Sequence, residues 1–219
     1  MDKKDLIAQS PIRFFDNATN AGLKNGEIGL ITAKKGLGKT SILVQFGIDS
    51  LLNDKPLVHV SFDQQSSNVI AWYSSVLTEI AKKRNLNVDE LNEDIMKNRT
   101  ILNFNEETFT LPKVVSTLKA LKDGGIKIAS VVVDGLTLDK TEKTDLECFA
   151  KFIKSEKMTA WFSYSCESAS LKDTLPEDKL NIFASVAHLA AEGKDLVLSV
   201  LKNGEGKVKL DPKTLLFSK

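Results

Sequence analysis

The segment ITAKKGLGKTS at 31–41 constrains the fold more than any other part of the sequence. It joins an apolar, strand-like run at 27–32 (EIGLIT) to a segment at 39–53 whose apolar residues recur at helical spacing. The connecting residues 33–40, AKKGLGKT, match the phosphate-binding loop pattern, with Ala33 in place of the first glycine. A strand, a Gly-rich turn and a helix in this order predict a nucleotide phosphate site.

The residue types in this loop suit phosphate chemistry. Small residues allow backbone N–H groups to turn inward around a phosphate without a Cβ in the way. Lys39 is expected to reach the β- and γ-phosphates, and the Thr40 hydroxyl to bind Mg²⁺ where the helix begins. The side chains of Lys34 and Lys35 are expected to be exposed at the loop tip. The predicted nucleotide-binding set is Ala33, Lys35, Gly36, Leu37, Gly38, Lys39, Thr40 and Ser41.

A second half-site is predicted at Asp134. The residues Val131, Val132 and Val133 before it read as part of a buried strand. A carboxylate at the carboxyl edge of a parallel sheet, beside a phosphate loop, can hold a magnesium-bound water. We therefore pair Asp134 with Thr40 as the predicted metal-binding residues; the structural alternative is a turn-forming Asp-Gly.

Strands and helices are predicted to alternate along the chain, which favours an α/β fold with a mostly parallel sheet covered on both faces. Residues 195–210 predict a terminal antiparallel hairpin that turns near Asn203-Gly204 or Gly206. The segment 165–183 is predicted to be a polar loop with a helical turn after Pro176. The segment 184–191 fits a helix and a strand equally well. We expect one domain, 1–219, with 1–25 as a lead-in segment. The predicted strands are 57–62, 99–104, 126–135 and 159–164; the predicted helices run from Ser66 or Ser67 to about Arg84, from Asn87, from Thr110 to Gly124, and over 142–156.

Composition argues against several classes of protein. The net charge is +1, so a bulk electrostatic case for nucleic-acid binding is missing. No apolar run approaches the roughly 18–20 residues needed to cross a bilayer, and the N-terminus carries no apolar signal core. Cys148 and Cys166 fit a reducing compartment, and we expect a cytoplasmic protein. His59 and His188 lie far apart and lack metal-ligand spacing, so we expect structural roles for both.

The span 15–65 resembles the opening of KaiC-like and RecA-superfamily P-loop ATPases, with its Phe15-Asp16 lead-in, its loop, Gln45-Phe46, and a strand that ends in Val-Ser-Phe. The strand before Asp134 and the terminal LSVLKNGEGKVKL are also similar, so the resemblance covers about 12–210. It implies a RecA-like core that binds ATP with Mg²⁺. It also implies a polar γ-phosphate sensor, for which Ser163 and Ser165 are candidates beside their reading as ordinary strand-end serines.

Two departures from the family pattern bear on catalysis. The resemblance places a pair of glutamates after the second strand, where this chain has Asp63 and Gln64. Asp63 can still act as a base, but it is shorter, and Gln64 cannot take a proton. The family's terminal Lys-x-Arg reaches a neighbouring subunit's nucleotide. Here Lys202 and Asn203 are followed by Gly204, so the arginine is absent and hydrolysis is expected to be slow.

Three functions stay open at this point. The first is a slow ATPase with Asp63 and Lys39 as catalytic residues. It would act as a regulatory or assembly module that forms a homo-oligomer or binds a protein partner. The second is a non-hydrolysing nucleotide sensor. The third is a DNA-recombination ATPase, which is disfavoured because the loop at 165–180 has four acidic residues and two lysines, a net charge of −2. Trp72 and Trp161 are expected in the core and not as base-stacking platforms.

Overall fold

The computed structural model describes residues 7–8, 10–19, 22–82, 92–93, 95–105, 110–168 and 170–218. The helix expected from Asn87 begins outside these residues. The described strands form one sheet in the order β3-β2-β4-β5-β1-β6-β7-β8-β9. The strands are β1 (Ile28–Ala33), β2 (Leu57–Ser61), β3 (Arg99–Asn103), β4 (Ser130–Asp134), β5 (Thr159–Ser165), β6 (Ser185–Glu192), β7 (Asp195–Lys202), β8 (Lys207–Leu210) and β9 (Phe217–Ser218).

The sheet has a parallel part and an antiparallel part. Strands β3, β2, β4, β5, β1 and β6 run parallel, and β7, β8 and β9 continue the sheet with antiparallel pairs. The predicted α/β class with a terminal antiparallel hairpin is confirmed. The parallel strands bring their carboxyl ends to one edge, where Ala33 aligns with Ser165 and Ser61 with Asp134.

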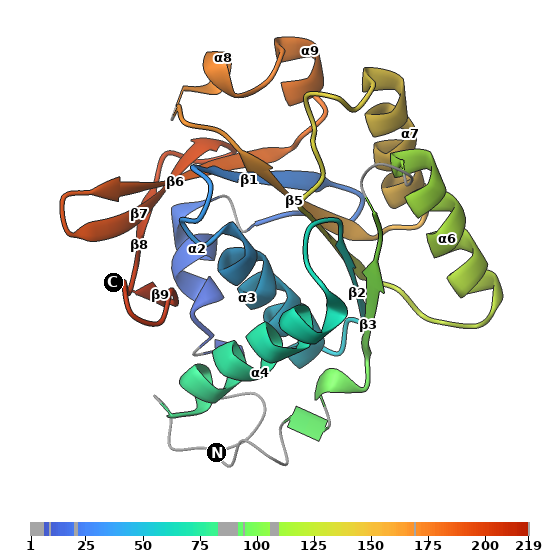
Figure 1. Ribbon diagram of the computed structural model, residues 1–219, viewed down its shortest axis with the longest axis horizontal. Helices are drawn as coiled ribbons and strands as arrows, with labels where there is room; N and C mark the ends of the chain where they lie inside the picture. Colours follow the sequence, from blue (N-terminus) through green and yellow to red (C-terminus); the bar gives the residue numbers. More distant parts are fainter. Residues whose placement is uncertain are drawn as a thin grey trace.

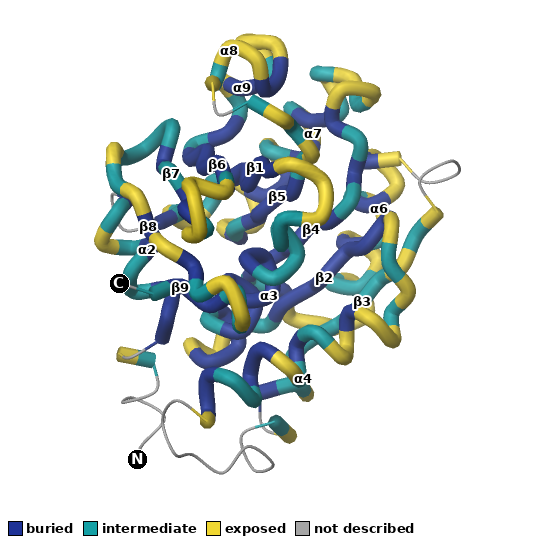
Figure 2. The backbone as a smooth tube through the Cα atoms, turned by 60° about the vertical axis from the view of Figure 1, so that its left-hand side comes forward, coloured by how far each residue is buried: buried dark blue, intermediate teal, exposed yellow. Residues whose placement is uncertain are grey.

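Helices cover both faces of the sheet (Figure 1). Helices α2 (Ile12–Ala18), α3 (Lys39–Leu52) and α4 (Ser66–Lys82) lie over one face. Helices α6 (Leu111–Asp123), α7 (Lys143–Ser155), α8 (Leu171–Thr174) and α9 (Glu177–Leu180) lie over the other. Figure 2 shows the central strands as buried, α3 as buried or intermediate, and exposed residues on the outer helices α4, α6 and α7.

An aromatic cluster fills the core under α2 and α3. The ring of Phe46, on α3, stacks on Trp161 of β5 with 4.4 Å between centroids and 6° between planes. Phe15 of α2 packs edge-on against both rings, at 5.0 and 5.6 Å. The lead-in segment therefore contains a helix that closes the core, since Phe15 is 1% exposed. Stacked and edge-on aromatic pairs add to the free energy gained from burying their area.

Two local expectations differ from the structure, and a third segment, left open between helix and strand, is a strand. The strand expected at 126–135 begins only at Ser130, because Ile126 is 41% exposed and lies in the connection after α6. The segment 184–191, which fitted helix and strand equally well, lies almost wholly in strand β6 (Ser185–Glu192), which sits between β1 and β7 and is therefore apolar without a clear period. The loop at 165–183 contains α8 besides the predicted turn after Pro176. None of the described helices is both long and apolar enough to span a membrane.

Candidate nucleotide-binding site

The predicted phosphate loop joins the carboxyl end of β1 to the first turn of α3. Gly36 and Gly38 have φ values of 85° and 106°, a region that residues with a Cβ rarely adopt. These two glycines turn the backbone so that α3 begins directly at Lys39. The first residues of α3 leave backbone N–H groups without helical partners, and the helix dipole adds partial positive charge there. Both effects favour a bound anion at the loop.

The Lys39 side chain lies across the end of the sheet. Its Nζ donates to Oγ of Ser165 at 3.0 Å and to the carbonyl of Ala33 at 3.4 Å. Burial lowers the pKa of Lys39, and the carboxylates of Asp134 and Asp63 oppose that shift. The Lys39 ammonium is thus held between β1 and β5 by weak neutral acceptors, which a phosphate oxygen can replace.

Thr40, Asp134 and Ser163 form a connected polar group. The Thr40 hydroxyl donates to Oδ2 of Asp134 at 2.7 Å, and the Ser163 hydroxyl donates to Oδ1 at 2.5 Å. Ser163 also accepts a hydrogen bond of 3.1 Å from the backbone N–H of Gly135. The two carboxylate oxygens of Asp134 are therefore oriented from both sides.

Burial raises the pKa of Asp134, and the hydrogen bonds from Ser163 and Thr40 oppose the shift. Asp134 is only 3% exposed, and the charge of Lys39 also opposes the rise in its pKa, less strongly than those hydrogen bonds do. A hydroxyl and a carboxylate in contact are hard oxygen donors, which fit Mg²⁺ together with substrate phosphates. The residues present therefore suit Mg²⁺.

Asp63 lies two residues beyond the end of β2, beside Gly135. A Cβ built at position 135 would come within 2.6 Å of Asp63 Cγ, and Gly135 has a φ of 81°. The glycine thus leaves the space that the Asp63 carboxylate occupies. Partial burial, and then the charge of Asp134, raise the pKa of Asp63. A carboxylate with a raised pKa beside the phosphate loop suits a general base.

Gln64 takes a structural position beside this carboxylate. The backbone N–H of Gln64 donates to the Ser61 hydroxyl at 3.2 Å, and its carbonyl accepts from Asn103 on β3. These contacts fix the turn after β2, which sets the direction of Asp63. Gln64 lines the cleft as an amide and cannot act as a proton acceptor there.

These groups share one cleft of about 870 Å³, large enough for a nucleotide. Two of its walls were not expected from the sequence. One is Trp72 on α4, predicted to be a core residue but only partly buried. The other is formed by Lys213, Thr214 and Leu215, which belong to no recognisable motif. Trp161, by contrast, is 6% exposed and lies in the core as predicted.

Lys202 has an internal partner in this structure. Its Nζ donates to the carbonyl of Leu180, the last residue of α9, at 3.2 Å. Lys179 of the same helix donates to the carbonyls of Leu138 and Asp139, each at 3.1 Å. The two lysines therefore tie the segment around α9 to the end of β7 and to the loop after β4.

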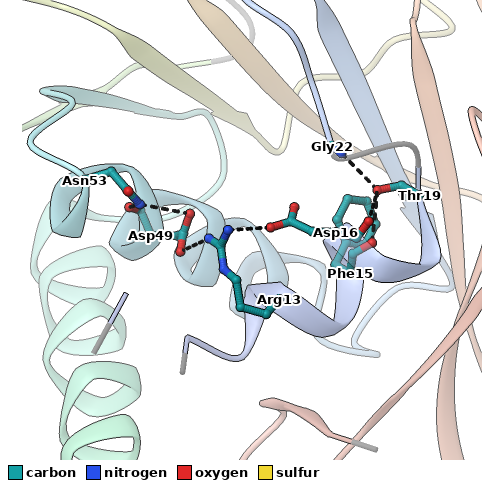
Figure 3. A network of polar contacts seen from close by, with 7 residues as sticks. All are labelled: Arg13, Phe15, Asp16, Thr19, Gly22, Asp49 and Asn53. Atoms are coloured by element: carbon teal, nitrogen blue, oxygen red, sulfur yellow. Dashed lines mark hydrogen bonds and ion pairs between the residues drawn. The ribbon is translucent and has the colours of Figure 1, made fainter. Parts of the chain in front are cut away.

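A second cavity, of about 220 Å³, lies at the opposite, amino edge of the parallel strands. Arg13 of α2 dominates it, with 2.6 Å to Asp16 and 2.5 Å to Asp49 of α3 (Figure 3). Asn53 contacts Asp49 in the same network. The guanidinium is already paired with two carboxylates, so this network joins α2 to α3 and offers no equivalent of the phosphate loop.

A nucleotide-sized cleft formed by a phosphate loop and an acidic strand end, at the carboxyl edge of a parallel sheet, defines a P-loop protein with a RecA-like core. The family model described as "ATPase: KaiC" matches residues 8–193. The chain belongs to the KaiC ATPase family, within the RecA superfamily, as its motifs predicted. A search of curated proteins finds no match.

Proposed function

We propose that the chain binds ATP together with Mg²⁺ in this cleft and hydrolyses it slowly, as a nucleotide-dependent regulatory or assembly module. The observation that carries the proposal is the contact between Thr40 and Asp134, 2.7 Å, in the same cleft as the Lys39 ammonium. On one edge of the sheet, Lys39 supplies a cation for phosphate, and Thr40 and Asp134 supply two oxygen ligands for a metal.

Each residue has a distinct role in this proposal. Backbone N–H groups from Ala33 to Ser41 hold the phosphates, and Lys39 exchanges its bond with Ser165 for the β- and γ-phosphates. Thr40 and Asp134 hold the metal and its water, whose charge neutralises the phosphate oxygens. Asp63 accepts the proton of the attacking water. Its short side chain, and the amide at Gln64, are the reasons why we expect slow turnover.

A nucleotide sensor that signals to a protein partner is the second candidate. Gln64 favours it, because the position beside Asp63 offers no second proton acceptor. Lys202 favours it too. Its ammonium bonds to the carbonyl of Leu180 in the same subunit and does not extend toward the nucleotide of a neighbouring one. In this case the nucleotide would order the segments near Asp63 and Ser165, and a partner would recognise that form.

A DNA-dependent ATPase has less support. In the segment that contains α8 and α9, Asp173, Glu177 and Asp178 are exposed, and Glu167 is 74% exposed. These carboxylates repel the phosphate backbone of DNA.

Cys148 and Cys166 are free thiols, which supports the proposed cytoplasmic location.

Equilibrium binding of labelled ATP, with and without Mg²⁺, tests the proposal. We expect Lys39→Ala to weaken binding at least tenfold, because it removes the ammonium that contacts the β- and γ-phosphates in this proposal. The matched control is Lys34→Ala, since Lys34 is 63% exposed and its partner is the exposed Glu167. Equal weakening by both variants, or no binding by the wild type, would contradict the proposal.

A further inference from the structure

The last described residues, 211–218, cross back over α3 and reach the nucleotide cleft. We call this segment the C-terminal strap. It lies beyond residues 8–193, where the family model matches. Its middle residues Lys213, Thr214 and Leu215 line the cleft, whereas Leu216 and Phe217 are buried in the core beneath. The strap therefore has a fixed end and a part that faces the site.

Gln45 connects the strap to the helix that begins at the phosphate loop. Its Nε2 donates to the carbonyl of Leu215 at 2.8 Å and to the carbonyl of Ser41 at 3.3 Å. Its Oε1 accepts from the backbone N–H of Phe217 at 3.0 Å. Gln45 is 1% exposed and its bond to Phe217 is buried, so an amide left unpaired at this position would be costly.

The strap also contacts the phosphate loop directly. A Cβ built on Gly38 would lie 3.0 Å from Cδ1 of Leu215. Leu215 has a φ of 56°, a left-handed conformation that is uncommon for a leucine. Asp211 stabilises the turn before it by accepting from the N–H groups of Lys213 and Thr214, at 2.9 and 3.1 Å.

We propose that Gln45 is a positioning residue, which holds the C-terminal strap against the phosphate loop so that Lys213, Thr214 and Leu215 complete the wall of the nucleotide cleft. This inference rests on the proposed function. Nucleotide binding and strap docking then stabilise each other. The coupling is reciprocal, so each increases the other by the same factor.

The test follows two readouts on the full chain. One is the equilibrium affinity for labelled ATP with Mg²⁺. The other is the rate of tryptic cleavage after Lys213, an exposed residue, identified by mass spectrometry with and without ATP. In the wild type we expect ATP to slow this cleavage several-fold, because cleavage requires the strap to leave the cleft.

Gln45→Met keeps the length of the side chain and removes its hydrogen bonds. We expect faster cleavage after Lys213 without nucleotide, and about tenfold weaker ATP binding, the effect of losing roughly one net hydrogen bond of strap docking. Ser50→Ala is the matched control. It removes a part-buried 3.1 Å bond from α3 to the carbonyl of Lys55, beside the smaller cavity and not the nucleotide cleft, and is expected to leave both readouts unchanged.

Gln45→Glu separates positioning from packing. A protonated glutamic acid can donate to Leu215 and accept from Phe217, as the amide does, whereas a carboxylate cannot donate. We expect this variant to approach the wild type near pH 5.5 and Gln45→Met near pH 8. Leu215→Asn is a second variant that keeps the left-handed backbone and removes the side chain on Gly38, should Gln45→Met fail to fold.

The outcomes are distinguishable. If the wild type binds ATP, but cleavage is the same with and without ATP and Gln45→Met and Leu215→Asn bind as tightly as the wild type, the inference is overturned. If the wild type binds no ATP, the proposed function fails and the coupling fails with it. The cleavage rates without nucleotide still report in that case whether Gln45 holds the strap.

Discussion

The hydroxyl of Thr40 and the carboxylate of Asp134 are joined by a 2.7 Å hydrogen bond, although 94 positions separate them in the sequence. Thr40 is in the first turn of α3, which follows β1, and β5 runs between β1 and β4, the strand that ends in Asp134. Contact arises because the first turn of α3 extends over the end of β5. The same turn carries Lys39 to Ser165, so one helix start gathers the groups of the proposed site.

Asp134→Asn is expected to stabilise the nucleotide-free protein. Burial raises the pKa of Asp134, so the folded state loses stability as the pH rises from the ordinary carboxyl range through that raised pKa. An amide avoids this loss, and we expect the Tm at pH 7.5 to increase by a few degrees. Thermal unfolding at pH 7.5 and pH 4.5 measures the difference, which should shrink at the lower pH. An unchanged or lower Tm at pH 7.5 would be inconsistent with this reasoning.

Ser163→Ala is expected to lower the affinity of the ATP-bound protein for Mg²⁺. Ser163 contacts Asp134 and the backbone of Gly135, and it is 2% exposed. In the proposal it orients the carboxylate of Asp134 and does not bind the metal itself. Loss of such a support typically costs 10- to 100-fold in metal affinity. Titrating Mg²⁺ at a fixed ATP concentration measures this. ATP binding without metal should stay within about twofold of the wild type, and an equal loss in both conditions would indicate a purely structural effect.

Asp63→Asn is expected to slow cleavage of bound ATP by about 100-fold or more, the usual contribution of a general base. ATP affinity should change little, because Asp63 accepts a proton from water in the proposal and does not bind the phosphates. Rapid-quench measurement of phosphate formation, beside equilibrium binding, distinguishes the two effects. If the variant cleaves ATP at the wild-type rate, Asp63 is not the base and the sensor candidate gains support.

His59→Gln is expected to reduce the acid sensitivity of the fold. Burial, and then the charge of Arg99, lower the pKa of His59 to about 3, and its ring accepts or donates a 3.0 Å bond with Tyr73. The unfolded state therefore binds a proton below its ordinary pKa while the folded state does not, and stability falls as the pH drops from about 6.5 toward 3.

Urea unfolding at pH 7.5, 6 and 5 measures this contribution. The wild type should lose up to about 1.4 kcal/mol per pH unit from His59 alone below pH 6. The slope for His59→Gln should be shallower by that amount, whatever its absolute stability. Equal slopes for the two proteins would show that His59 is not the source.

The loop, the helix after it and the acidic strand end could be predicted because each carries a local signal. Gly36 and Gly38 mark the turn, and the valines before Asp134 mark a strand buried on both faces. The parallel register then brings Ala33 and Ser165 to the same edge. A regular sheet propagates such local assignments into three dimensions.

The walls of the cleft could not be predicted in this way. Trp72 lies on the apolar face of α4, and helical spacing does not tell which end of that face extends beyond the core. Leu215 reaches the loop only because Gln45 and the buried Phe217 hold the strap. Neither contact has a sequence period, since each depends on where distant elements meet.

A single-turnover experiment shows directly whether the cleft binds ATP and hydrolyses it. Excess protein is mixed with limiting labelled ATP and Mg²⁺, and bound and cleaved nucleotide are followed together, with Lys39→Ala as the control. We expect the wild type to retain the nucleotide and cleave it over minutes, and the Lys39→Ala control to do neither. Nucleotide that is retained intact for hours would contradict the proposed ATPase activity and favour a nucleotide sensor. A wild type that retains none would contradict the proposed site itself.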